Sequence, residues 1–457
     1  MSTRDVRVLE GPEKLRMLLE RGNGELAAFL REQHPVDLAD MVEELPDDLL
    51  VAVFERLGPE QSALVLGELD REARARIVRL LGKERVGDIV EAMDTDDAAD
   101  LLGELSPEQA GQILGELQAE EAAEVRELLH YEPDTAGGIM TTEYVAVNQG
   151  MTAQEAIEHL RQRAPDAETV YYVYVVDDDE HLLGVLSLRD LIVAPPETPL
   201  KHIMRTKVVS VFHDQDQEEV ARIVSRYDLL AVPVIDHQRR LLGVVTVDDV
   251  IDVLEEEATE DALRAAAVSP GEEGGDLRGG VWRLARPRLP WLLALLFMEF
   301  LAGSVIDRFR GGFDGVTLAL LSVFIPIMAG EAGNGATQAL AVVVRGLATG
   351  EIAEREVLAV VWREARVGLL AGLITGVVLF GVTTLWKGDL RLGLVVGLAL
   401  ALNLPVAKML GGLFPIVIHR LGIDPAVASG PFITTVTDFT SMLTYFTVAA
   451  LLLTQLG

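Results

Sequence analysis

Hydrophobic and polar positions follow three successive patterns along the chain, and the first pattern predicts an array of short helices. From His34 to His130 a unit of about 12 residues recurs, which begins with proline, aspartate, threonine or a charged residue and ends on an apolar pair. Proline and acidic residues favour the first turn of a helix, so each unit predicts one helix. Helices this short cannot bury an apolar face alone, and we expect them to stack as an α-solenoid.

The second pattern is a βα repeat in two halves. Residues 173–192 align with residues 232–251, and each copy has an alternating apolar strand, a polar turn, a second apolar strand and a helix that begins near an aspartate. Asp190 in the first copy matches Asp249 in the second. The repeat resembles a tandem pair of CBS domains, a regulatory βα module.

The resemblance to CBS domains implies a nucleotide pocket. In such pairs an aspartate at the position of Asp190 or Asp249 often holds the ribose of an adenine nucleotide, which makes Tyr172, Arg189 and Asp190 the candidate pocket and ATP the candidate cofactor. Leu229 stands where related transporters can offer an aromatic side chain to the base. The sequence leaves ATP binding open.

The third pattern consists of five apolar segments, each long enough to cross a bilayer at about 20 residues per helix. They cover approximately residues 289–306, 316–347, 367–386, 392–418 and 426–456. Arginines are concentrated on the flanks that face the cytoplasm if the acidic domains lie inside, in agreement with the positive-inside rule. We expect a multi-pass protein of the inner (plasma) membrane, in contact with lipid, with cytoplasmic N-terminal domains and its C-terminus outside.

The net charge of the chain changes where the apolar segments begin. The 457 residues are 49% hydrophobic and 24% charged, with a formal net charge of −33. Residues 1–280 hold 26 basic and 61 acidic side chains, a net charge of −35, so nearly all of the acidity precedes the first apolar segment. Such a surface repels nucleic acid and attracts cations. Because the chain has no cysteine, its metal ligands must be oxygen atoms or its eight histidines.

The last apolar segment contains one ionisable residue, Asp438, among hydroxyl side chains that include Thr434 and Thr435. A carboxylate at bilayer depth costs about 2.5–3.5 kcal/mol on insertion scales, and such residues are functional candidates by default. We interpret Asp438 as a divalent cation site that faces a water-filled path. The alternative is a buried structural carboxylate bonded to the neighbouring hydroxyls.

The second apolar segment contains a glycine-rich interruption, PIMAGEAGNGATQ, at residues 326–338. We expect irregular backbone there that lines a path, because such backbone is tolerated at membrane depth only against protein or water. Close helix packing is the alternative. Glu299 and Glu331 are further acids within apolar segments, and Lys408 could pair with one of them. The candidate pore-lining residues are Gly330, Gly333, Asn334, Gln338, Thr434 and Thr435.

Two acidic groups before the apolar segments are metal candidates. Asp96, Asp97 and Asp100 cluster near a helix start. After the second βα half, four acids fall on one face of a predicted helix, where like charges are destabilising unless a divalent cation offsets them. These four are Asp249, Asp252, Glu256 and Glu260, and further candidate ligands are Asp216, Glu218, Asp228, Glu257 and Asp261. The alternative is a solvated acidic surface.

These parts, in this order, resemble the MgtE magnesium channel family over nearly the full length. The residues that carry the resemblance are AGGIM-TTEYVAV at 136–147, the Gly-Asn element at 330–338 and DPA…PFITTVTD at 424–438. The resemblance implies that Asp438 holds hydrated Mg²⁺ in a pore, that Asp424 lies at its cytoplasmic mouth and that the protein is a homodimer. It also implies Mg²⁺ sensing by Asp96, Asp216, Glu218, Asp228, Asp249, Asp252, Glu257, Glu260 and Asp261.

The predicted architecture is a multidomain membrane protein. We expect an acidic α-helical N domain (1–135), a tandem CBS pair (136–248), a connecting plug helix with a linker (249–280) and a five-helix all-α transmembrane domain (281–457). The family resemblance implies a Mg²⁺-selective uptake channel that intracellular Mg²⁺ closes. A Na⁺- or H⁺-coupled carrier and a non-conducting sensor of Mg²⁺ or nucleotide stay open as alternatives. No nucleophile–base pair or phosphate loop stands out, so we expect no enzyme activity.

Overall fold

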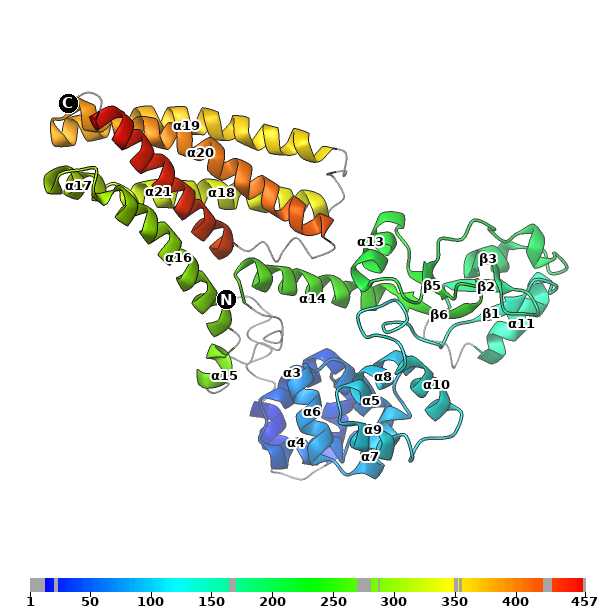
Figure 1. Ribbon diagram of the computed structural model, residues 1–457. Helices are drawn as coiled ribbons and strands as arrows, with labels where there is room; N and C mark the ends of the chain where they lie inside the picture. The colour runs from blue at the N-terminus through cyan, green and yellow to red at the C-terminus, as the bar shows by residue number, and fades with distance from the viewer. Residues whose placement is uncertain are drawn as a thin grey trace. The chain divides into compact units, whose positions relative to one another are not determined.

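Contacts divide the chain into two compact units, Met1–Glu257 and Ala258–Gly457, and helix α14 (Val247–Ala265) runs across the boundary. The structure is a computed structural model (Figure 1) that describes residues 13–19, 24–163, 170–268, 281–286, 288–348, 352, 356–421 and 430–454. Asp424 lies outside the described residues.

The first unit begins with the predicted helical array. Its helices are α2 (Gly24–Glu32), α3 (Pro35–Glu43), α4 (Asp47–Phe54), α5 (Pro59–Gly67), α6 (Arg71–Leu80), α7 (Lys83–Val90), α8 (Thr95–Gly103), α9 (Pro107–Ile113) and α10 (Glu121–Leu128). Helices α3, α5, α7 and α9 pack in succession, while α4 packs on α6 and α8 on α10. The helices from α3 to α10 thus pack on helices two places away in the chain and bury apolar faces that they could not bury alone, which confirms the helical N domain.

Residues at the start of each repeat open the helices as predicted. Proline occupies the first turn of α3, α5 and α9. The Asp70 side chain accepts a hydrogen bond from the backbone N–H of Ala73 at 2.7 Å, and Ser106 forms a capping box with Gln109. These caps satisfy backbone donors that have no partner within the helix.

Two three-stranded sheets follow, one for each half of the βα repeat. The first half comprises β1 (Ala146–Asn148), α11 (Ala153–Arg163), β2 (Tyr172–Val176), β3 (Leu182–Ser187) and α12 (Leu188–Val193), and the second comprises β4 (Val211–Phe212), α13 (Gln217–Tyr227), β5 (Ala231–Ile235), β6 (Leu241–Thr246) and α14. In each sheet the first strand is parallel to the second, and the third is antiparallel to it. Gly184 pairs with Val175 and Gly243 with Val234, so the aligned glycines occupy equivalent places. A Cβ on Gly243 would lie 2.6 Å from the carbonyl oxygen of Thr141, which explains why glycine is needed there.

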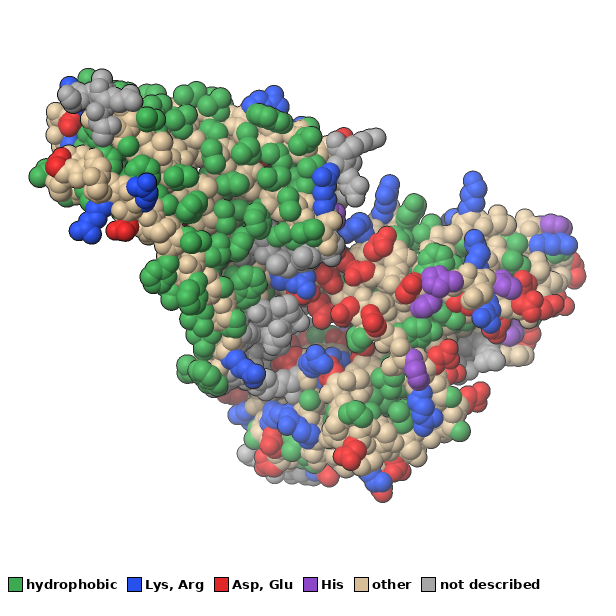
Figure 2. Space-filling model, viewed as in Figure 1, with side chains coloured by type: hydrophobic (Ala, Val, Ile, Leu, Met, Phe, Trp, Pro, Cys, Tyr) green, Lys and Arg blue, Asp and Glu red, His purple; other side chains and the backbone are tan. Residues whose placement is uncertain are grey.

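The second unit contains five candidate membrane spans within the part of the chain that is described. They are Leu289–Arg310 (α16), Gly315–Leu347 (α17, Gly315–Ser322, with α18, Ile325–Ala348), Val357–Lys387 (α19), Leu390–Arg420 (α20) and Gly430–Leu453 (within α21, Gly430–Thr454), and a short helix α15 (Val281–Ala285) precedes them. In the 18-residue apolar stretch of α20, 61% of the residues are buried, whereas in that of α16 only 11% are buried. Helix α20 is therefore central in this unit and α16 is peripheral. Figure 2 shows hydrophobic side chains over much of the visible face of this unit.

The glycine-rich part of the second span is helical, and the prediction of irregular backbone there was wrong. α18 runs without a break from Ile325 to Ala348, and the span is interrupted earlier, between Ser322 and Ile325. Pro326 follows directly and lacks the N–H that would continue the preceding helix. A helix satisfies its own backbone in lipid, so the glycines remain helical and allow close approach. A Cβ on Gly333 would lie 3.1 Å from Thr434 Cγ2.

Candidate functional site

The first candidate site lies where helix α8 meets the second half of the βα repeat. The Thr95 hydroxyl accepts a hydrogen bond from the Thr142 backbone N–H at 3.1 Å, and it lies 3.3 Å from the Thr141 hydroxyl. This contact places the first turn of α8 beside the segment that enters the βα repeat. Acidic side chains from three separate segments meet here, namely Asp94, Asp97, Asp100, Glu143 and Asp249.

The pKa values of these acids are raised. Burial raises the pKa of Asp97 to about 6, and the neighbouring Asp94 carboxylate adds to the effect while Arg74 opposes it. Burial raises the pKa of Asp249 to about 6. The Thr246 hydroxyl donates a hydrogen bond to this carboxylate and lowers the pKa in part. Desolvated carboxylates this close repel one another, so the arrangement favours either protons or a bound cation.

Two further acids extend the same cluster. The Asp100 side chain reaches the surface, yet the surrounding protein excludes enough water to raise its pKa to about 6, with Arg74 opposing and the charges of Glu104 and Asp249 adding. Burial raises the pKa of Glu143 to about 7, and Asp94 contributes next. Sequence reasoning missed Asp94 and Glu143, although Asp94 directly precedes the acidic helix start and Glu143 lies in the quoted TTEY segment.

Asp96 differs from its neighbours. Its side chain is buried, and its Oδ1 accepts a hydrogen bond from the Asp97 backbone N–H at 2.9 Å. The structure thus brings Asp97 and Asp100 toward Asp249 but gives Asp96 a local bond at the helix start.

The candidate ligands on α13 and α14 do not form one cluster. Asp216 caps α13 by accepting from the Glu218 N–H at 2.9 Å, and Glu218 forms an ion pair with Arg222. Asp228 ends the same helix, about 18 Å away at 1.5 Å per residue, so it cannot share a coordination sphere with Asp216. On α14, Glu257 accepts from Gln217 Nε2 at 2.7 Å.

The remaining acids of α14 lie along its length. Burial raises the pKa of Asp252, and the charges of Glu255 and Asp248 add to it. Glu256 contributes to the raised pKa of Asp100, which places it near the cluster around α8. Glu260 forms an ion pair with Arg264 one turn later, and Asp261 is exposed.

The second candidate site lies among the membrane-spanning helices. Asp438 on α21 is half-buried, and its side chain is hydrogen-bonded to Glu299 on α16, a helix that packs against α21. Two carboxyl groups in hydrogen-bond contact must share a proton or a cation. Sequence reasoning singled out both acids but could not pair them, because they are far apart in the chain.

The hydroxyls around Asp438 are used elsewhere. Thr434 and Thr435 both donate to the carbonyl oxygen of Pro431, at 2.8 and 2.9 Å. Thr437 and Thr440 donate to carbonyls three residues earlier, and Ser441 accepts from Asn403 Nδ2 at 2.8 Å. The hydrogen bonds described for these hydroxyls therefore do not support the alternative of a carboxylate held by its neighbours.

A polar stripe runs along one exposed face of α18. Gly330, Asn334 and Gln338 are spaced one turn apart, and all three are exposed. Lys408 on α20 is buried and donates a hydrogen bond to Gln338 Oε1 at 3.1 Å. This partner is an amide oxygen, whereas the sequence had suggested one of the acids Glu299 and Glu331. Gly333 lies on a buried face of α18, where it packs against Thr434.

A pocket of about 520 Å³ lies in the βα repeat, at the position predicted for a nucleotide. It is lined by Tyr171, Tyr172, Ser187, Leu188, Arg189, Ile192 and Leu230. Asp190 is not among the lining residues, because its carboxylate accepts from the Ser187 N–H at 3.2 Å and caps α12. Leu230 faces the pocket, while Leu229 packs against the core. Sequence reasoning missed Tyr171, an exposed aromatic residue suited to stacking on a base.

The chain matches three protein-family models. The model described as a divalent cation transporter matches residues 325–448, the MgtE intracellular N domain matches residues 33–134, and the CBS domain matches residues 136–197 and 200–256. The chain is 45% identical over 334 residues to the magnesium transporter MgtE of Thermus thermophilus, a match that covers 72% of each protein. It is 44% identical over 328 residues to the MgtE of Enterococcus faecalis, covering 72% of this chain and 71% of that protein.

Two solved structures share the fold of the first unit. One is a crystal structure of the soluble part of a magnesium transporter, 38% identical with a TM-score of 0.52, which covers 55% of this chain and 99% of that chain. The other is the cytosolic domain of the Mg²⁺ channel MgtE in complex with ATP, 45% identical with a TM-score of 0.51, which covers 53% of this chain and 99% of that chain.

Proposed function

Because this chain belongs to the MgtE family of magnesium transporters, we propose that it is a Mg²⁺-selective channel for uptake that intracellular Mg²⁺ closes. The two relatives that match 72% of this chain are named as transporters, in keeping with the expectation that it is not an enzyme. The proposal has two parts, conduction through the membrane unit and control by the acidic first unit.

Conduction is assigned to Asp438, supported by its contact with Glu299. Mg²⁺ sheds water reluctantly and is usually held through its hydration shell by one or two carboxylates. A paired carboxyl site at bilayer depth can attract such an ion without stripping all of its water. Asp424 is proposed as a further acid at the cytoplasmic mouth of the path.

A second copy of the chain would complete the path. Gly330, Asn334 and Gln338 form a polar stripe that a single chain leaves exposed among apolar helices. Polar side chains within a bilayer face a bundle interior or water rather than lipid. We propose a homodimer whose two-fold axis brings the two stripes and the two Asp438 residues together, since such dimers are the commonest assemblies.

Closure by Mg²⁺ rests on one observation, the crowding of Asp97, Asp100 and Asp249 with raised pKa values. These carboxylates come from α8 and α14, so a bridging ion would hold the two helices together. Asp96, Asp216, Glu218, Asp228, Asp252, Glu256, Glu257, Glu260 and Asp261 are proposed as further contributors to Mg²⁺ sensing. When internal Mg²⁺ is low, repulsion separates the acidic segments, and α14 transmits the change to the membrane unit.

The proposed orientation places the acidic unit in the cytoplasm and the C-terminus outside a cell (plasma) membrane. It rests on the excess of arginine near the cytoplasmic ends of the spans, for example Arg345 in the last turn of α18 and Arg420 in the last turn of α20.

ATP is proposed as a regulatory ligand of the pocket that Tyr172 and Arg189 line. The pocket volume is in the range of small-molecule sites, Tyr171 offers an aromatic face, and Arg189 offers a cation for phosphate. Asp190 would act by holding the start of α12 in place. The relative solved with ATP supports this assignment.

The conduction proposal is tested by measuring Mg²⁺ entry into liposomes that contain the full-length protein. Asp438→Asn should reduce entry to the protein-free background, because the amide cannot attract a divalent cation. Asp307→Asn, which alters an exposed acid of α16, is the matched control and should retain wild-type entry. Wild-type entry by Asp438→Asn would remove the assignment.

One feature, the buried Lys408 beside the polar stripe, favours the alternative of an ion-coupled carrier. A buried lysine that exchanges its proton can couple one ion flow to another. Recordings from single molecules distinguish the two, since a channel gives unitary currents and a carrier gives none. A non-conducting sensor would fail the liposome assay with the wild-type protein.

A further inference from the structure

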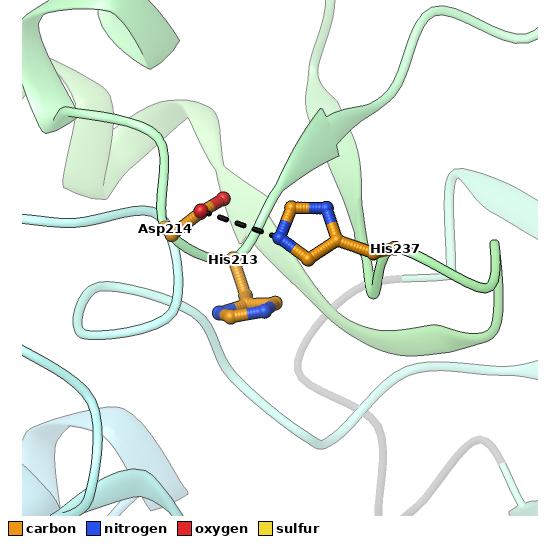
Figure 3. A group of neighbouring side chains, drawn as sticks. All are labelled: His213, Asp214 and His237. Atoms are coloured by element: carbon orange, nitrogen blue, oxygen red, sulfur yellow. Dashed lines mark ion pairs between the residues drawn. The ribbon is translucent and has the colours of Figure 1, made fainter.

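Two histidines and an aspartate gather on the second half of the βα repeat, and none of the three belongs to the acidic cluster around α8. His213 and Asp214 directly follow β4, and His237 lies in the turn between β5 and β6 (Figure 3). The candidate ligand atoms of all three lie within 4.8 Å of one another. Asp214 Oδ2 and His237 Nε2 are 3.3 Å apart, and the two imidazole rings are 5.4 Å apart between centroids.

Backbone hydrogen bonds fix the loops that carry these side chains. The His213 N–H donates to the carbonyl oxygen of Ile235 at 3.1 Å, and the His213 carbonyl accepts from the Gly137 N–H at 2.8 Å. The Asp236 carboxylate accepts from the N–H groups of Gln238 and Arg240, which holds the turn around His237. The three ligands therefore start from anchored positions, and only side-chain rotations are needed to bring them together.

The donor set selects the class of metal. Imidazole nitrogen suits Zn²⁺, Ni²⁺ and Cu²⁺, whereas Mg²⁺ prefers oxygen and octahedral geometry. Ligands bound tetrahedrally at 2.0–2.1 Å from Zn²⁺ lie about 3.3 Å apart, which is the separation that Asp214 and His237 already have. We propose that His213, Asp214 and His237 bind a borderline transition-metal dication of the Zn²⁺ class, with water completing its coordination.

The site lies at the joint between the helical array and the βα repeat. The Ala136 N–H donates to the Gln215 carbonyl at 2.7 Å, and the Tyr131 ring lies 5.5 Å from the His213 ring. Together with the bond from Gly137 to His213, these contacts fasten the end of the array to the loop that carries two of the three ligands. A bound ion would restrain this loop and thereby strengthen the joint.

Binding is tested on the purified full-length protein, treated with chelator and kept in a large excess of Mg²⁺ so that oxygen sites are filled. Zn²⁺ affinity is measured by calorimetry, and Co²⁺ is used as a coloured substitute whose visible absorption reports nitrogen ligands. The wild type should show a site that His213→Gln and His237→Gln each weaken by about 100-fold or more, since even outer-shell changes at metal sites cost 10–100-fold. His202→Gln alters an exposed histidine of the same region and should leave the site intact.

Two further variants decide the assignment. Asp214→Asn should weaken binding, because a neutral amide is a poorer ligand than a carboxylate. His181→Gln removes a member of the separate group Asp177, Asp179 and His181, and should not change the Co²⁺ spectrum. Equal Zn²⁺ affinity in the wild type and in folded His213→Gln and His237→Gln, or loss of the site in His181→Gln alone, would overturn the proposal.

The effect on the joint is measured by hydrogen exchange of residues 135–138. Zn²⁺ should slow exchange of the Ala136 and Gly137 amides in the wild type and leave it unchanged in His237→Gln. Exchange that Zn²⁺ does not alter in a protein shown to bind it would overturn the coupling to the joint.

Discussion

At the scale of single residues, Lys408 is an unusual cation within a membrane helix. It is buried on α20, and its ammonium donates to Gln338 on the polar stripe of α18. If that stripe lines the path of Mg²⁺, the charge of Lys408 adds an electrostatic barrier to a divalent cation. We expect Lys408→Met, which retains the length of the side chain, to increase Mg²⁺ entry by about two- to tenfold at low external Mg²⁺.

The Lys408 prediction is checked by liposome flux and has a built-in control. Lys408→Arg retains the charge, so it should not raise entry. Equal entry by the methionine and arginine variants would show that Lys408 acts by packing rather than by charge.

At the scale of elements, α19 and α20 are held in close contact by glycines. A Cβ on Gly376 would lie 2.5 Å from the Gly397 carbonyl oxygen, and one on Gly372 would lie 2.8 Å from the Ala401 carbonyl oxygen. Small residues allow helices to approach in lipid, where no hydrophobic force drives them together. Gly376→Ala should therefore destabilise the membrane unit by about 1–3 kcal/mol through overpacking.

Gly381 on the same helix is the matched control for Gly376. A Cβ there meets nothing within 4 Å, so Gly381→Ala should be neutral or stabilise by up to about 1 kcal/mol through helix propensity. Thermal unfolding of the detergent-solubilised protein measures both variants. Similar melting temperatures for the two would contradict the packing argument.

The acids of α14 give a second prediction at this scale. Neutralising Asp249, Asp252 and Glu260 together should give a channel that internal Mg²⁺ closes poorly, because fewer carboxylates favour the ion-bound state. Patch recordings at increasing internal Mg²⁺ measure the closure. An unchanged Mg²⁺ response would remove α14 from the sensor.

At the scale of the whole molecule, the raised pKa values link pH to Mg²⁺. The pKa values of Asp97, Asp100 and Asp249 rise from 3.8 to about 6, and that of Glu143 from 4.5 to about 7. These groups bind protons more tightly when α8 lies against the βα repeat than when it is released. Docking of α8 is thus most favoured below about pH 4 and loses this contribution as the pH rises to about 7.

This linkage predicts how protons and Mg²⁺ replace one another. Protease protection of the first unit should require Mg²⁺ at about pH 8, and should persist without Mg²⁺ at about pH 5. The variant with Asp97, Asp100 and Asp249 all changed to asparagine should show the same protection at both pH values, whether or not Mg²⁺ is present. A control with exposed Asp37, Asp40 and Asp48 changed to asparagine should behave as the wild type does. Protection that depends on neither pH nor Mg²⁺ would contradict this account.

Much of the fold could be predicted because it depends on local chemistry. Pro or Asp stands at the start or the N-cap of α3, α4, α5, α6, α8 and α9, and the aligned strands of the βα repeat predicted both sheets. The glycine-rich run at 326–338 was misread because glycine is compatible with either irregular backbone or close helix packing, and only the neighbours of α18 decide between them. The sequence predicted which acidic residues belong to the candidate sites, but it did not predict which residues those acids contact.

The sequence by itself determined where helices start, which segments are apolar enough to cross a bilayer and that acidity is confined to the first 280 residues. These follow from periodicity and charge, which act over a few residues. Only the tertiary structure brought Asp97 to Asp249, Glu299 to Asp438 and His213 to His237. Such contacts join segments that are distant in the chain, and they are set by how whole helices and sheets pack, which no local pattern specifies.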